Sequence, residues 1–265
     1  MFALHDVIRQ HADLSLYVDV DIHGQIIRRV LRDITRKRRE PNDILLNLAE
    51  VAIPLQYEYV TTTRQFADII INNDYRPETE SARQGSTLPQ LKVAGWPLQG
   101  ALTELRAEYI CTFSSYDRYF TSHDRNLEKS GEEFRFREES DRLMLTYKGP
   151  LTGALGERFV LTCSIDEGTF RALTRFYRET LVYVQKTRRL FLLEGALIGL
   201  DDVTLKNPQA NGPESMHVTE VRLTGHQTDD SVATNIIKRL GLNPERSTPA
   251  SYFSIALNPS LLPLE

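Results

Sequence analysis

The chain has 265 residues, a formal net charge of −4 and 41% hydrophobic residues. This length suits one large domain or two small ones, and the composition is that of an ordinary globular protein. The acidic balance argues against a protein whose whole surface binds nucleic acid, but the 32 lysines and arginines leave room for a local basic cavity.

The sequence shows no cationic start followed by an apolar core and no apolar run of about 18 residues, so we expect a cytoplasmic protein with no membrane segment. The two cysteines, Cys111 and Cys163, lie in apolar, strand-like runs without metal-ligand spacing. We expect them to be buried thiols in a reducing compartment.

Residues 1–50 are expected to form a helical, basic N-terminal extension, and residues 51–265 a separate domain. Apolar residues recur at helical spacing among the arginines of segment 28–39, which favours an amphipathic basic helix over 25–39. A strand pair through 16–20 and 26–27 is the open alternative. The basic segment is either a solvated face or a surface for a partner or nucleic acid. Residues 41–43 are expected to cap a helix over 44–51.

The next stretch predicts a strand over 53–60, with Glu58 at its middle, and a capped helix over 64–72. Residues 74–100 are rich in Pro, Gly, Ser and charge, which indicates a long loop or an inserted hairpin. A further strand is expected from about 105 to 113.

Alternation then becomes regular. Residues 132–147 predict a hairpin with one apolar face and one polar, cation-bearing face, with its turn at 138–141. A strand over 157–163 and a helix over 166–177 follow. Alternating strands are expected over 181–193, 196–203 and 217–223, then a helix over 230–240 that Gly241 ends. Strands that follow one another in this way favour an α+β, mainly β fold, an antiparallel meander or barrel with flanking helices.

Basic residues recur on the polar face of several separate strands: Arg135, Arg137, Lys148, Lys186, Arg188 and Arg222. One interpretation is a sheet whose charged face lies in water. The other is a closed sheet with these residues inside, where so many cations would repel one another unless an anion offset them. Phosphate groups are the natural ligands of inward-facing Arg and Lys.

Carboxylates lie on or near the same strands: Glu58, Asp201 and Glu220. A cavity that holds phosphate with Mg²⁺ or Mn²⁺ needs such hard oxygen ligands, although each acid alone is more often a surface or ion-paired residue. The sequence contains no Ser-His-Asp arrangement, P-loop or glycine-rich dinucleotide turn.

The order of motifs from about 105 to 257 resembles the CYTH, or triphosphate tunnel, family. The residues that carry the resemblance are Asp117 to Phe120, the Arg135-x-Arg137 strand, Thr146-Tyr147-Lys148-Gly149-Pro150, Lys186-x-Arg188, Leu200-Asp201-Asp202-Val203, Thr219-Glu220-Val221 and the tail Ser251-Tyr252.

This resemblance implies an eight-stranded antiparallel barrel whose tunnel binds a triphosphate. Arg135, Arg137, Lys148, Lys186, Arg188 and Arg222 would bind phosphates. Glu58, Asp201 and Glu220 would hold Mg²⁺ or Mn²⁺, and Lys148, Lys186 and Glu220 would be catalytic. The ligand would be a small molecule that bears a triphosphate, or an RNA 5′ end.

Two features depart from the family pattern. Residues 56–60 keep one acid and no lysine where the family's first strand alternates glutamates before a lysine. The late strand pairs Glu220 with Arg222 where two glutamates are usual. The resemblance favours a metal-dependent triphosphatase. The missing acids leave a catalytically degraded nucleotide or polyanion binder as one alternative, and the tail leaves an adenylyl cyclase as another.

Overall fold

The computed structural model describes residues 6–37, 39–74, 90–151, 158–209, 215–224 and 230–263. The chain divides into two compact units. Unit 1 comprises Met1–Arg76, Thr121–Leu127 and Cys163–Arg178, and unit 2 comprises the remaining segments. Each unit is described by itself.

Unit 1 combines helices with a two-stranded parallel sheet. Strand β1 (Leu16–Asp19) pairs with β2 (Ile69–Asn72). Between them lie α2 (Ile22–Lys37) and a continuous helical stretch: α3 (Pro41–Asn47), η2 (Leu48–Ala52), α4 (Ile53–Leu55), η3 (Gln56–Val60) and η4 (Thr61–Phe66). The short α1 (Asp6–Arg9) precedes β1, and α7 (Glu167–Leu173) joins the unit from later in the chain, with Asp166 as its N-cap.

The helix predicted over 25–39 is confirmed as α2, and the alternative strand survives only as β1. Ile26, Ile27 and Val30 on its apolar face are each 1% exposed. Arg29 and Arg32 donate to the buried Asp33 at 2.8 Å. These arginines therefore stabilise unit 1 itself, and recognition of nucleic acid or a partner by segment 28–39 stays a prediction.

The strand predicted over 53–60 is wrong, because these residues continue the helix that begins at Pro41. The helical spacing of the buried Ile44, Leu45, Leu48, Ala49 and Ile53 extends into this stretch. Pro54 has no amide hydrogen to donate, and π-helical turns lie on either side of it. The helix predicted over 64–72 is also wrong: it is a 3₁₀ turn followed by β2.

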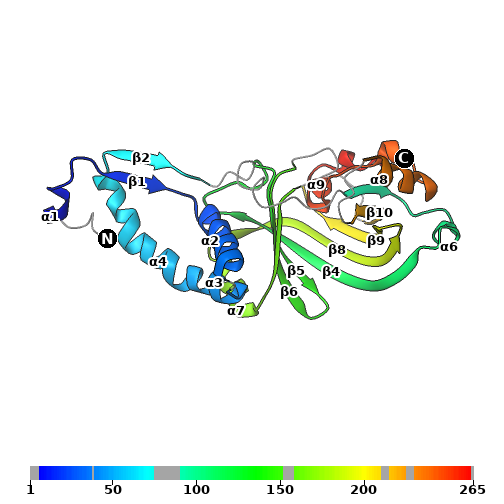
Figure 1. The fold of residues 1–265 in the computed structure, drawn as a ribbon, viewed down its shortest axis with the longest axis horizontal. Coiled ribbons are helices and arrows are strands. Elements are labelled where there is room, and N and C mark those ends of the chain that lie inside the picture. Colours follow the sequence, from blue (N-terminus) through cyan, green and yellow to red (C-terminus); the bar gives the residue numbers. More distant parts are fainter. Residues whose placement is uncertain are drawn as a thin grey trace. The chain divides into compact units, whose positions relative to one another are not determined.

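Unit 2 is built on one eight-stranded antiparallel sheet in the order β3-β10-β9-β8-β4-β5-β6-β7 (Figure 1). The strands are β3 (Gln90–Ala94), β4 (Glu108–Ser122), β5 (Glu133–Glu139), β6 (Arg142–Lys148), β7 (Val160–Ile165), β8 (Tyr177–Leu193), β9 (Ala196–Lys206) and β10 (Ser215–Leu223). The long strands β4, β8 and β9 are strongly curved in Figure 1. The mainly β, antiparallel prediction is confirmed. Of the segment predicted as a loop or hairpin over 74–100, residues 75–89 lie outside the described residues, and residues 90–94 are a strand.

The predicted hairpin is confirmed as β5 and β6, with Arg135 opposite Thr146 and Arg137 opposite Met144. Ser140 and Asp141 form its turn with positive φ angles of 47° and 63°. The strands expected over 181–193 and 196–203 are the long β8 and β9, joined at Glu194 and Gly195.

Helices cover the sheet of unit 2 on both faces. On one face, called the outer face, α8 (Asp230–Arg239) packs Ile236 and Ile237 against β3, β9 and β10. On the opposite face, called the inner face, α9 (Tyr252–Leu257) packs on apolar residues of β8, β9 and β10. Lys92 of β3 and Thr248 exchange backbone hydrogen bonds of 2.8 Å, which ties the segment before α9 to the sheet edge. The short helices α6 (Ala101–Glu104), η6 (Pro244–Arg246) and η7 (Pro259–Leu261) complete the unit.

None of the helices in the described ranges is long and apolar enough to cross a membrane.

Candidate anion-binding site

The basic residues singled out in the sequence lie on four strands of unit 2 and line one cavity of about 260 Å³. They are Arg135 and Arg137 on β5, Lys148 on β6, Lys186 and Arg188 on β8, and Arg222 on β10. The two-residue spacing within β5 and within β8 places each pair on the same face, because side chains alternate across a strand. Lys92 on β3 joins them. The sheet face that lines this cavity is the inner face, on which α9 packs.

A second cavity of about 490 Å³ shares Gln90, Arg135, Arg137, Glu139, Lys148 and Arg222 with the first. Its lining includes Gln90 of β3 as well as Val160 and Thr162 of β7. These strands are the two edges of the sheet. The sheet therefore curves until both edge strands line the same hollow.

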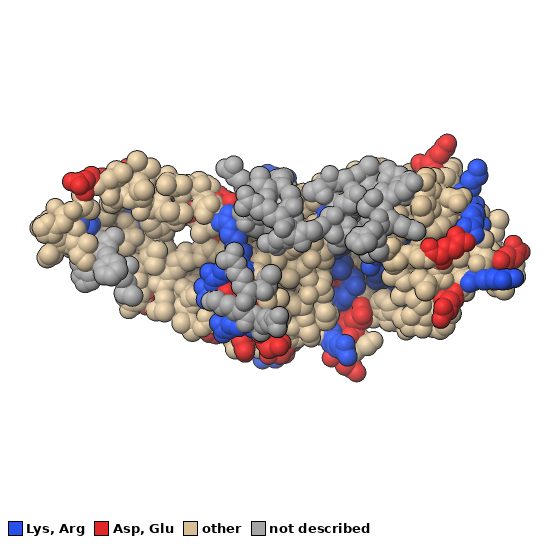
Figure 2. Space-filling view, in the orientation of Figure 1, with Lys and Arg blue, Asp and Glu red and all other residues tan. Residues whose placement is uncertain are grey.

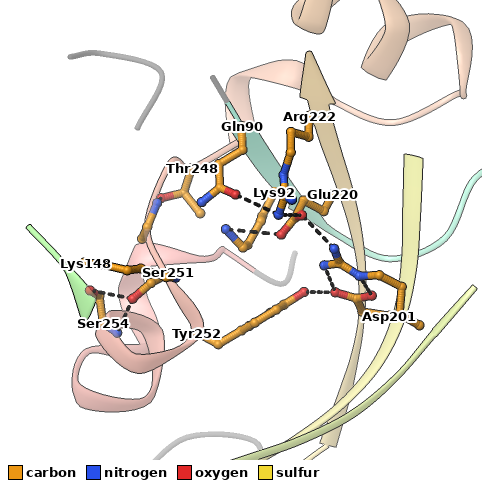
Figure 3. A network of polar contacts seen from close by, with 12 residues as sticks. Gln90, Lys92, Lys148, Asp201, Glu220, Arg222, Thr248, Ser251, Tyr252 and Ser254 are labelled. Atoms are coloured by element: carbon orange, nitrogen blue, oxygen red, sulfur yellow. Dashed lines mark hydrogen bonds and ion pairs between the residues drawn. The ribbon is translucent and has the colours of Figure 1, made fainter. Parts of the chain in front are cut away.

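Arg188 organises one wall of the cavity. Its Nε and Nη2 each donate to a carboxylate oxygen of Asp201 at 2.6 Å, and its Nη1 donates to Glu220 at 2.9 Å. Figure 3 shows Tyr252 of α9 reaching Asp201, to which its hydroxyl donates at 2.5 Å. Asp201 is 0% exposed and Arg188 is 6% exposed. A two-point pair of this kind fixes the guanidinium in orientation as well as in position.

Asp117 of β4 holds two arginines of β5 in place, as Asp201 holds Arg188. It accepts hydrogen bonds from Arg135 at 2.8 Å and from Arg137 at 2.6 and 2.9 Å. Burial alone would raise the pKa of Asp117, but the charge of Arg135 and the hydrogen bonds from Arg137 outweigh it and hold this pKa well below its usual value. Asp117 therefore stays ionised and keeps both arginines in place.

A third cluster lies at the end of β5 and β6. Arg158 donates to Glu133 at 2.7 Å, and the Nζ of Lys148 lies 3.5 Å from the other oxygen of this carboxylate. Burial opposes ionisation of Glu133, but Arg158 and Lys148 lower its pKa well below the usual value. Here too the buried acid is held ionised by cations.

Two lysines of the cavity, Lys186 and Lys92, have no hydrogen-bonded carboxylate partner among the described residues. Lys186 is 5% exposed, and its Nζ forms neither a hydrogen bond nor an ion pair with any described residue; its nearest aromatic contact is the Tyr252 ring, 5.6 Å to the centroid. The Nζ of Lys92, 2% exposed, lies 3.6 Å from Glu220 and has no hydrogen-bond partner in the described part of the chain.

Burial lowers the pKa of Lys92, Lys148 and Lys186. In Lys186 the neighbouring charge of Arg188 lowers it further, and in Lys148 and Lys92 a carboxylate opposes the burial without overcoming it. Ammonium groups that are both desolvated and surrounded by like charge are costly to hold in an empty cavity.

The described cavity residues and their ion-pair partners carry an excess of positive charge. The cations are Lys92, Arg135, Arg137, Lys148, Arg158, Lys186, Arg188 and Arg222, and the carboxylates are Asp117, Glu133, Glu139, Asp201 and Glu220. Eight positive groups face five negative ones, and the Nε of Arg135 is a further buried donor without a partner in the described residues. A multiply charged anion with many acceptor oxygens would satisfy both the charge and the donors.

The carboxylates do not fit the divalent metal site that the resemblance implied. No group of three His, Cys, Asp or Glu side chains among the described residues could hold a metal ion. Asp201 is bonded to Arg188 and Tyr252, and Glu220 accepts from Arg188 and Arg222. A metal at either acid would first have to displace these donors. The arrangement can bind an anion as it stands.

The structure brings together all the sequence-predicted site residues except Glu58. Asp201 is bonded to Arg188 and is not itself among the lining residues. The residues that line the cavity are Arg135, Arg137, Lys148, Lys186, Arg188, Arg222 and Glu220. Glu58 is exposed in η3 of unit 1 and is not among the lining residues. The strand assignment that made it a candidate ligand was wrong.

Sequence reasoning missed Lys92, Gln90, Glu133 and Arg158, and it used Asp117 and Tyr252 only as residues that carry the resemblance, without a role in the site. A signal for the first two existed, because Gln90-Leu91-Lys92-Val93-Ala94 alternates polar and apolar residues over one short strand. The segment around them was interpreted as a long loop or an inserted hairpin, and no site residue was sought in it. Arg158 and Glu133 carried no signal that distinguishes a buried pair from a surface pair.

The comparisons with known proteins agree with this geometry. The family model described as "CYTH domain" matches residues 92–252, more than half of the chain. The chain therefore belongs to the CYTH domain family, which confirms the resemblance. It is 25% identical over 156 residues to "Inorganic pyrophosphatase TTM2" of Arabidopsis thaliana, covering 56% of this chain and 22% of that protein. The PH1819 protein of Pyrococcus horikoshii OT3 has the same fold, with a TM-score of 0.50, 24% identity and coverage of 64% of this chain and 98% of that one.

A different family matches the N-terminal part of the chain. The model described as "Phosphoribulokinase / Uridine kinase family" matches residues 1–79. A uridine kinase of Bacillus pumilus is 38% identical over 72 residues, which is 27% of this chain and 34% of that enzyme. The chain thus spans about a third or less of the length of the curated relatives it matches.

Proposed function

We propose that unit 2 binds the phosphate chain of a triphosphate or similar short polyphosphate in its basic cavity and hydrolyses a phosphoanhydride bond. The observation that carries the proposal is the convergence of Lys92, Lys148 and Lys186, from three strands, on one cavity without enough carboxylates to neutralise them. A chain of phosphates presents negative charge and acceptor oxygens along its length. The Arabidopsis relative is named as an inorganic pyrophosphatase, an activity on the same class of bond.

In this proposal Arg135, Arg137, Lys148, Lys186, Arg188 and Arg222 donate to phosphate oxygens. Lys148 and Lys186 stabilise the charge that develops as water attacks phosphorus and the bridging oxygen leaves with the bonding electrons. Glu220 holds Arg188 and Arg222 toward the phosphates. Members of the family generally use divalent metals, and such an ion would orient the attacking water. The acids of this cavity do not provide for it.

We also propose that the sheet closes as a tunnel around the bound phosphates. Strands β3 and β7 both contribute to the lining of the second cavity, which supports closure at this edge. The ligand would then be screened from bulk water. Inside the tunnel, each contact of a Lys or Arg side chain with a phosphate is stronger than at an open surface.

A binder without turnover is the second candidate, because every buried carboxylate of the cavity that could hold a metal is already ion-paired. The match at residues 1–79 covers only a third of a uridine kinase, so we propose no kinase activity for unit 1.

Phosphate release from pyrophosphate, tripolyphosphate, ATP and an RNA 5′-triphosphate tests the proposal, each assayed with Mg²⁺, with Mn²⁺ and with EDTA. Release that is lost in Lys148→Met and kept in the exposed control Lys238→Met supports hydrolysis in the cavity. Cyclic AMP formed from ATP would instead identify a cyclase. Binding of one of these anions without any turnover would select the second candidate, and the absence of binding would reject both.

A further inference from the structure

On β3 and β10, the inner-face neighbours of Glu220 are basic or neutral, and the nearby acid Asp201 of β9 is taken up by Arg188 and Tyr252. Lys92 lies directly opposite Glu220 in the β3–β10 pair, and Gln90 lies opposite Arg222. Arg222 follows Glu220 on the same face of β10, and its Nη2 donates to Glu220 at 2.9 Å and to Gln90 at 3.3 Å. Figure 3 shows Lys92 and Arg222 both directed at the Glu220 carboxylate.

This arrangement leaves Glu220 without the oxygen-rich surroundings that Mg²⁺ requires. Mg²⁺ takes an octahedral shell of oxygens at about 2.0–2.1 Å and dehydrates reluctantly. One oxygen of Glu220 already accepts from Arg188 and Arg222, and the other lies 3.6 Å from Lys92. Gln90 offers one neutral amide oxygen, which itself accepts from Arg222.

The charge of the cavity points the same way. A divalent cation would be placed among Lys92, Arg188 and Arg222, and no free carboxylate among the described residues of the cavity offsets their repulsion. A polyphosphate that already carries Mg²⁺ has two fewer negative charges than the free anion. It would therefore gain less from the same lysines and arginines.

We infer that the cavity recognises its polyphosphate as the metal-free anion, with Lys92 and Arg222 supplying the positive charge beside Glu220 that a divalent ion would otherwise supply. This inference rests on the proposed function, because it concerns the ligand of the same cavity. It assigns Gln90 and Arg222, which face each other across β3 and β10, as the residues that decide between free and metal-bound ligand.

Titration calorimetry with tripolyphosphate, and separately with pyrophosphate, tests the inference on the full chain. One titration contains EDTA, and the other contains Mg²⁺ in large excess over the ligand. We expect binding in EDTA and an apparent affinity about tenfold or more weaker in excess Mg²⁺, because complex formation removes the free anion. Binding that requires Mg²⁺, or is tighter with it, would overturn the inference and leave the proposed function standing. The absence of heat under both conditions would overturn the proposed function as well.

Two variants make the test specific. Arg222→Glu places a second acid beside Glu220, at a side chain that is 41% exposed and so tolerant of substitution. Gln90→Glu introduces an acid of nearly the same shape opposite it. In each we expect binding in EDTA to weaken about tenfold or more and Mg²⁺ to improve binding, the reverse of the wild type.

Arg246→Glu is the matched control, because Arg246 is exposed, lies in the same unit and does not line the cavity. It makes the same change of charge and should bind as the wild type does in both buffers. Thermal melts without ligand show whether each variant is folded. If folded Gln90→Glu and Arg222→Glu retain wild-type binding in EDTA and gain nothing from Mg²⁺, the assigned role of this pair is wrong.

Discussion

The side chain of Arg188 crosses the inner face of β9 directly over Gly199, where a β-carbon would lie 2.9 Å from its Nε. Gly199 pairs with Glu220 of β10 and with Leu190 of β8, two residues along β8 from Arg188, and its lack of a side chain lets the Arg188 guanidinium span β9 and bond to Glu220 at 2.9 Å. A single glycine thus connects three strands of the anion site.

Gly199→Ala is predicted to displace Arg188, because the added methyl group overlaps the guanidinium. Overpacking of this kind costs about 1–3 kcal/mol of stability. We expect tripolyphosphate affinity to fall as well, since Arg188 loses its fixed orientation. Calorimetry and thermal melts measure both effects. Thr187→Ala is the control, because Thr187 is exposed on the opposite face of β8, and wild-type binding by Gly199→Ala would contradict the role given to Arg188.

Lys186→Met is predicted to stabilise the ligand-free protein while weakening anion binding. The substitution removes a buried ammonium group that has neither a hydrogen bond nor an ion pair in the described residues. Replacing buried charge by apolar side chains of similar volume is often stabilising, here by about 1–3 kcal/mol. Denaturant unfolding gives the stability and calorimetry the affinity.

The control for this experiment is Lys238→Met, at an exposed position of α8, which should change neither property. A less stable Lys186→Met protein would show that this ammonium group supports the fold rather than a ligand.

The stability of the ligand-free protein is predicted to rise with pH between the lowered pKa values of its buried lysines and the ordinary lysine pKa of 10.5, because the unfolded chain binds more protons than the folded one over this range. The sign follows from Lys92, Lys148 and Lys186, whose pKa values burial lowers from the ordinary 10.5. Near pH 10 the raised pKa of Tyr252 begins to act in the opposite direction.

Denaturant midpoints across this pH range, with and without tripolyphosphate, check the prediction. A bound anion restores the charge of the lysines, so the rise should shrink when ligand is present and in Lys186→Met. Stability that stays flat or falls as the pH rises toward 10 in the ligand-free protein is incompatible with lysines whose pKa values burial lowers.

Tyr252→Phe is predicted to cost about 1–2 kcal/mol of stability through loss of its hydrogen bond to the buried Asp201. Asp201 keeps both bonds from Arg188, so the anion site should persist and affinity should change less than in Gly199→Ala. Denaturant unfolding and calorimetry on the two variants make the comparison. A larger loss of affinity in Tyr252→Phe would show that the hydroxyl itself contacts the ligand.

The part of the site that could be predicted from sequence is the part built from regular alternation. Arg135, Arg137, Lys186 and Arg188 recur every second residue, which fixes their common face once the strands are identified. The pairing across β3 and β10 could not be read in this way, because Lys92 and Glu220 are far apart in the chain and meet only through sheet order.

The strand assigned around Glu58 failed for a different reason. Within the eight residues 53–60, the pattern Tyr57-Glu58-Tyr59 looks like strand alternation. A window this short does not separate a helix from a strand. The longer period set by Ile44, Leu48 and Ile53 decides the outcome, since these residues bury one face of a helix. The ion pairs of Asp117 and Glu133 depend on burial, which sequence pattern alone does not provide.

A crystal structure of the protein with tripolyphosphate tests the central claim most directly. We predict phosphate oxygens within hydrogen-bond distance of the Nζ atoms of Lys92, Lys148 and Lys186 and of the free Nε of Arg135, inside unit 2. On the face in view in Figure 2, acidic and basic side chains are interspersed. Tripolyphosphate bound elsewhere on the chain, with no phosphate oxygen near these four groups at saturating ligand, would contradict the claim.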